Sequence, residues 1–62
     1  MTAGSRIHFP DPYIPNRERW GTITSGGREM YINWDDDLRW DYLEDWLRAA
    51  DANGWQYEVK SY

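Results

Sequence analysis

The sequence contains no cysteine and only one histidine among its 62 residues. The absence of cysteine excludes disulfide bonds and cysteine-based zinc sites, and a lone histidine offers too few ligands for a structural metal. No apolar run approaches the roughly 18 residues of a membrane-spanning helix, and the first residues lack a hydrophobic signal region. We therefore expect a cytoplasmic protein without cofactor, metal or membrane contact, whose fold depends on side-chain packing alone.

Aromatic side chains are abundant by contrast. Five Trp, five Tyr and one Phe make up 18% of the chain. Each large ring can bury roughly 150 to 250 Å², so these residues can build a core although the mean hydropathy is −0.99. A chain of this length forms one domain at most.

All three prolines lie between residues 10 and 15. Proline pushes its preceding residue towards extended conformations, so we expect residues 1–18 to form an arm packed on the domain, with a short strand at 6–9. Residues 19–62 then make up the folded domain.

A hairpin is predicted with Gly26-Gly27 as its two-residue connection, because glycine tolerates the positive φ angles of tight hairpin turns. The flanking runs, 19–25 and 28–34, are rich in residues that favour strands. The second run alternates two sets of side chains, so one face should be core. The two sets are Met30, Ile32, Trp34 and Glu29, Tyr31, Asn33.

From Asp36 to about Ala52 the apolar residues recur with the period of a helix, and Asp35 and Asp36 are the N-cap candidates. The Asn-Gly pair ending at Gly54 predicts the helix end, and residues 55–62 alternate as a third strand. The apolar arc of this helix contains Leu38, Tyr42, Leu43, Trp46, Leu47, Ala49 and Ala50.

The predicted fold is α+β, a small β-β-α-β domain. Its three-stranded, mainly antiparallel sheet has one helix packed on one face. The connection lengths permit the strand order 2-1-3 or the mixed order 1-2-3.

The negative charge is concentrated in the predicted helix. The chain carries a net charge of −4, whereas residues 35–51 hold seven acids against Arg39 and Arg48, a segment net of −5. The carboxylates follow one another at roughly 3.4 Å along the helix axis, close to the phosphate spacing of one DNA strand. They make a candidate partner-binding face that imitates DNA: Asp35, Asp36, Asp37, Asp41, Glu44, Asp45 and Asp51. The alternative is a face that only keeps the protein soluble.

Other chemistry has weaker signals. His8 has no nucleophile tied to it by a motif, and the acidic triplet at 35–37 lacks an EF-hand pattern. We therefore assign no catalytic residue and no metal site. Trp20, Tyr31 or Tyr57 could stack on bases, but such platforms need a positive groove. Exposed aromatic and arginine side chains dominate protein contacts, which makes Trp40, Arg48 and Tyr31 secondary contact candidates.

A short, cysteine-free, acidic, Trp-rich domain with carboxylates at Asp35-Asp36-Asp37, Asp41, Glu44-Asp45 and Asp51 resembles the small phage-encoded anti-CRISPR inhibitors. The resemblance lies in size and charge, not in a motif. It implies a non-enzymatic inhibitor in a bacterial host cell. The inhibitor would bind a basic nucleic-acid-binding protein, such as a subunit of a CRISPR surveillance complex, and block its binding of target DNA. We expect a monomer or weak dimer that binds no nucleic acid directly. The alternative is an adaptor, antitoxin or phage accessory module that binds through exposed aromatics.

Overall fold

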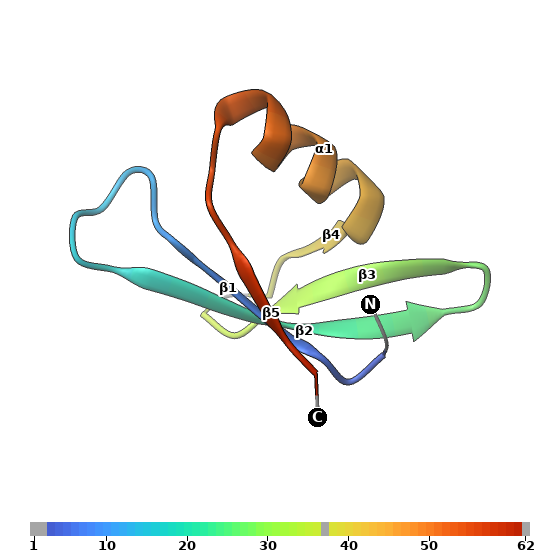
Figure 1. Cartoon of the computed structure of the whole chain (residues 1–62). Helices are drawn as coiled ribbons and strands as arrows, with labels where there is room; N and C mark the ends of the chain where they lie inside the picture. Colours follow the sequence, from blue (N-terminus) through green and yellow to red (C-terminus); the bar gives the residue numbers. More distant parts are fainter. Residues whose placement is uncertain (1–2, 37, 62) are drawn as a thin grey trace.

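The structure, a computed structural model, describes residues 3–36 and 38–61. One helix packs against a five-stranded antiparallel sheet in the order β4-β3-β2-β1-β5 (Figure 1). The α+β class is therefore confirmed. The elements are β1 Arg6–Pro10, β2 Glu18–Gly26, β3 Glu29–Trp34, β4 Trp40–Tyr42, α1 Leu43–Asn53 and β5 Glu58–Lys60.

The prediction of three strands is wrong, because two further strands join the sheet. The short strand expected at 6–9 is present as β1, and it lies between β2 and β5. Ile7 of β1 faces Gly21 of β2 on one side and Val59 of β5 on the other. Of the two predicted orders, 2-1-3 gives the correct side for the last strand, which lies beyond the first hairpin strand, but β1 stands between the two. The last strand is also shorter than predicted, Glu58–Lys60 instead of 55–62.

The predicted helix start is also wrong. Helix α1 begins at Leu43 instead of Asp36, and its N-cap is Tyr42, which makes no side-chain capping hydrogen bond. The residues before it form β4, in which Trp40 pairs with Asn33 of β3. Aromatic residues favour strands and pack against cross-strand neighbours, so this pairing replaces the first turns of the expected helix.

The predicted helix end is confirmed. Gly54 adopts a left-handed φ of 71°, and its N–H is directed at the carbonyl groups of Ala50 and Asp51. Glycine reaches this conformation without the penalty that a Cβ atom brings. The hairpin is confirmed as well, but its two-residue turn lies one residue later than predicted. Gly26 ends β2 and pairs with Glu29, so the connection is Gly27-Arg28 instead of Gly26-Gly27.

The core lies between α1 and one face of the sheet. It consists of Ile7, Phe9, Ile23, Ile32, Trp34, Leu43, Trp46 and Ala50. Two residues assigned to the apolar arc of the predicted helix are exposed instead, Leu38 at 103% and Tyr42 at 44%. Both precede α1, so neither can project from the helix into the core.

The predicted alternation in the second hairpin strand is confirmed. Ile32 and Trp34 are buried, whereas Asn33 is exposed on the opposite face. Figure 1 shows α1 on one side of the sheet, and within the described residues no helix covers the other side. The sheet thus has a helix-covered face and an open face.

Candidate partner-binding surface

The acidic residues that precede β4 are held in ion pairs. Asp35 accepts hydrogen bonds from both terminal nitrogens of Arg6, one of them at 3.0 Å. Asp36 Oδ2 lies 2.9 Å from an Arg17 nitrogen. These two carboxylates are therefore matched by arginines from distant parts of the sequence. Asp37, the third predicted contact of this group, lies outside the described residues.

The remaining predicted carboxylates do not form one helical stripe. Asp41 lies on β4, where its Oδ2 accepts a hydrogen bond of 2.7 Å from the indole N–H of Trp34. Asp45 is on α1, 3.4 Å from Arg48. Glu44 and Asp51 are exposed on the same helix. The expectation of a continuous acidic helix face is thus wrong, because α1 carries only the last three of the seven acids.

The structure instead gathers three aromatic side chains on the open face of the sheet. Tyr31 of β3 is paired with Tyr42 of β4, and Trp40 is the second outward residue of that strand. The ring centroids of Tyr31 and Trp40 are 5.7 Å apart, and those of Trp40 and Tyr42 are 4.9 Å apart. Both pairs are edge-to-face, a favoured aromatic arrangement. We call Tyr31, Trp40 and Tyr42 the aromatic patch.

The aromatic patch is accessible and slightly concave. Trp40 is 52% exposed and Tyr42 is 44% exposed. The rings border a hollow of about 400 Å³, whose other lining residues are Gly26, Glu29 and Asn33. A Cβ atom at Gly26 would lie 2.6 Å from Cε1 of Tyr31. The missing side chain of Gly26 therefore makes room for the tyrosine ring.

Two of these rings, Tyr31 and Trp40, were predicted as contact residues, and the structure brings them together. Tyr42 was missed because its position also suits the apolar arc of a helix. The signal that identifies it is the Trp-Asp-Tyr alternation of residues 40–42, which places both rings on one side of a strand.

Trp20, a candidate base-stacking residue, is largely covered by its neighbours on the open face. The His8 ring stacks on it at a centroid distance of 4.1 Å. The cationic groups of Arg6 and Lys60 lie 5.5 and 5.6 Å from the Trp20 ring centre. This end of the open face therefore presents charged groups, whereas the β3–β4 end presents rings.

His8 also lies between two glutamates. Its Nδ1 is 2.8 Å from Glu18 and its Nε2 is 3.2 Å from Glu58. Within residues 3–36 and 38–61, no group of three or more His, Asp or Glu side chains is arranged to hold a metal ion.

Comparison with known proteins gives no relative: no protein-family model, curated protein or solved structure matches this chain. In the part of the chain that the structure describes, no helix has the length and apolar character needed to cross a membrane. The function is therefore inferred from the geometry of the chain itself.

Proposed function

We propose that this protein acts by binding a partner protein, without catalysis, and that the aromatic patch carries the contact. The observation that supports this proposal is the contiguous group of rings, the exposed Trp40 and Tyr42 with the half-buried Tyr31, on a sheet face that no helix of the described residues covers. Tyr and Trp are enriched in binding hot spots, because they offer large contact area at a small cost in side-chain entropy.

The surroundings of the patch favour a protein partner over single-stranded nucleic acid. Base-stacking platforms combine rings with a positive groove that follows the phosphates. Glu29 is the charged residue among those that line the hollow, and no Lys or Arg of the described residues lines it. A phosphate backbone would therefore be repelled where the rings are.

The net charge of −4 favours a basic partner. A nucleic-acid-binding protein is a class that meets this condition, which keeps inhibition of such a protein as the second candidate function. The observation that favours it is the exposure of Glu44, Asp45 and Asp51 on α1. In that mechanism these carboxylates would occupy a Lys/Arg-lined groove and exclude DNA from it.

The experiment that tests the first proposal is affinity capture with wild-type protein and the double variant Trp40→Ser/Tyr42→Ser. Proteins captured by the wild type from a lysate of the encoding organism should be lost with the double variant. The matched control is Leu38→Ser, which removes a fully exposed apolar side chain outside the patch. Circular dichroism should show that all three proteins are folded. Equal capture by a folded double variant would contradict the proposal.

Charge reversal distinguishes the second candidate. The double variant Glu44→Lys/Asp51→Lys changes the solvent face of α1 by four charge units and leaves the buried residues and Asp45 untouched. If those carboxylates dock in a basic groove, like-charge contacts cost several kcal/mol, so capture should fail and wild-type affinity should fall steeply with salt. If the aromatic patch carries binding, the double variant should retain most of its affinity.

A further inference from the structure

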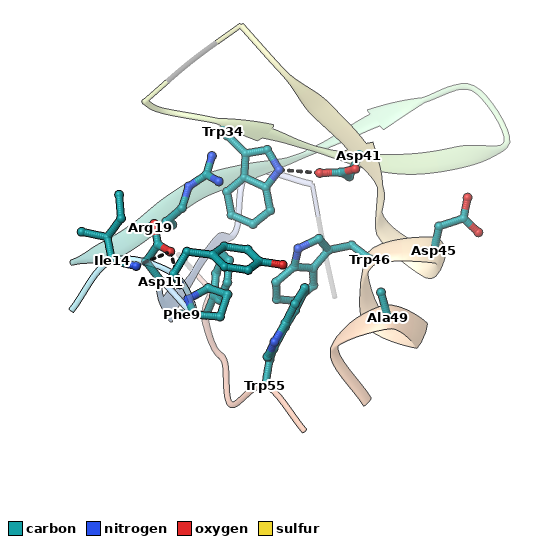
Figure 2. A pocket seen from close by; sticks show the side chains of 12 residues that line it. Phe9, Asp11, Ile14, Arg19, Trp34, Asp41, Asp45, Trp46, Ala49 and Trp55 are labelled. Carbon is teal, nitrogen blue, oxygen red and sulfur yellow. Dashed lines mark hydrogen bonds between the residues drawn. The ribbon is translucent and has the colours of Figure 1, made fainter. Parts of the chain in front are cut away.

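A second aromatic group lies on the helix-covered side of the sheet, where it lines a pocket between the β1–β2 loop and α1. The pocket has a volume of about 410 Å³; the rings of Phe9, Trp34, Trp46 and Trp55 form its wall, and Tyr13 of the loop also lines it. We call it the aromatic pocket. Figure 2 shows its rings grouped between the loop residues and the helix. The pocket faces away from the open face and is therefore separate from the aromatic patch.

Trp46 is the centre of this group of rings. Its centroid lies 4.9 Å from that of Phe9, 5.6 Å from that of Trp34 and 6.3 Å from that of Trp55. Mutual packing holds the four rings in place, so the wall of the pocket is formed before any ligand arrives. The π faces of indole rings carry negative electrostatic potential, and Trp is the best of the aromatic residues at attracting a cation.

The β1–β2 loop borders the pocket without closing it. Asp11 accepts hydrogen bonds from the backbone N–H groups of Tyr13, at 2.8 Å, and Ile14, at 3.1 Å. These bonds fix the turn, while the two side chains remain 84% and 46% exposed. The loop therefore forms one rim of an accessible pocket.

The charges on the loop side are matched within the protein. Arg19 lies over the Trp34 ring at 5.2 Å and has its Nε 3.8 Å from Asp36. Asp11 is likewise 3.7 Å from Arg17. This side of the pocket thus contributes little net charge.

The helix side carries an excess of negative charge. Asp41 interacts there with a neutral donor, the indole N–H of Trp34, so its charge is not cancelled by that contact. Asp45 is 68% exposed, and its contact with Arg48 is a long one of 3.4 Å on the helix surface. Figure 2 shows both carboxylates on the opposite side of the rings from Arg19. A cation entering the pocket would meet carboxylates at one rim and ring faces along its wall.

We propose that the aromatic pocket binds a basic side chain, lysine or arginine, of a partner protein. The aliphatic stem of such a side chain would pack on the rings of Trp46 and Trp55, and its charged end would lie at Asp41 and Asp45. Long basic side chains combine an apolar stem with a charged head, which matches the two kinds of lining. This inference does not depend on the aromatic patch, and either proposal can fail without the other.

The test is a titration of the full ¹⁵N-labelled chain with capped tripeptides of the form Gly-X-Gly, followed by NMR. With X as lysine or arginine, the indole N–H signals of the pocket residues Trp34, Trp46 and Trp55 should shift, and those of Trp20 and Trp40 should stay unchanged. Peptides with norleucine or glutamate are the controls. Binding of the norleucine peptide as tight as that of both basic peptides would overturn the proposal, as would shifts confined to Trp20 and Trp40.

A matched pair of variants tests the carboxylate rim. Asp45→Asn should weaken binding of the better basic peptide by about two- to fivefold, the size of an exposed ion pair. Glu44→Gln removes the same charge from the neighbouring helix position, which does not line the pocket, and should leave the affinity unchanged. Both residues are exposed, so both variants should fold. Equal affinities of the two variants for the peptide would show that the rim carboxylate takes no part.

Discussion

Gly21 of β2 lies directly against core side chains, and it gives the sharpest stability prediction. A Cβ atom at this position would lie 2.5 Å from Cγ2 of Ile32, 2.9 Å from Cε3 of Trp34 and 3.1 Å from the carbonyl oxygen of Asn33. Carbon atoms normally meet at about 3.5 to 4.0 Å. Ile32 is fully buried and Trp34 is 6% exposed, and the indole N–H of Trp34 is bonded to Asp41, so moving either side chain aside would cost core packing or this hydrogen bond.

The expected cost of Gly21→Ala follows from two opposing effects. Overpacking a core costs roughly 1 to 3 kcal/mol, and the overlap with two core side chains places this site at the upper end. Replacing glycine also reduces the entropy of the unfolded chain, which returns about 0.4 to 1 kcal/mol. We expect a net loss of about 2 kcal/mol or more, out of roughly 3 to 9 kcal/mol for a domain of this size.

Urea unfolding followed by tryptophan fluorescence measures this loss as a lower midpoint at unchanged slope. The matched control is Gly26→Ala, whose Cβ would meet the half-exposed ring of Tyr31 at 2.6 Å. That ring can swing towards solvent, so the control should lose less than about 1 kcal/mol. A Gly21→Ala protein within about 0.5 kcal/mol of wild type would refute the packing described for β2 and β3.

Two further predictions concern the core and the β1–β2 loop. Trp46→Ala should cost about 3 to 5 kcal/mol and leave the protein largely unfolded by circular dichroism, because Trp46 contacts Phe9, Trp34 and Trp55; a cooperative melt near that of wild type would contradict this. The N–H of Tyr13 lowers the pKa of Asp11, so the carboxylate stabilises the fold at neutral pH, and this contribution is lost as the pH falls through the lowered pKa. The urea midpoint should therefore fall less between pH 6 and pH 2 in Asp11→Asn than in wild type. If the midpoints of the two proteins fall in parallel with pH, the Asp11 hydrogen bonds do not stabilise the turn.

Local signals in the sequence determined the hairpin and the end of the helix. Gly26 and Gly27 predict a turn at this place, although the turn itself is Gly27-Arg28 and Gly26 ends β2; Gly27 has the positive φ of 77° that favours glycine. Gly54 ends the helix for the same reason. The alternation along residues 29–34 gave the buried face of β3 correctly. Each of these features depends on the conformational preferences of a few neighbouring residues, and these preferences do not depend on the rest of the fold.

The candidate site was only partly predictable. Tyr31 and Trp40 were recognised as contact residues from their type, but the pattern from Leu38 to Tyr42 suits a helix as well as a strand. The choice depends on a neighbour: residues 40–42 pair with β3, and Asp41 accepts the indole N–H of Trp34. Pairing with β3 provides hydrogen-bond partners for the backbone of β4 and places Trp40 and Tyr42 beside Tyr31.

The ion pairs of Asp35 and Asp36 were decided by tertiary structure alone. In the sequence, Asp35 and Asp36 are part of a run of like charge, and nothing nearby predicts their partners. In the fold, Arg6 reaches Asp35 across 29 positions of the chain, and Arg17 reaches Asp36 across 19. Charge counts along a sequence cannot reveal such pairs, because electrostatic interaction depends on distance in space and on the order of strands that brings the groups together.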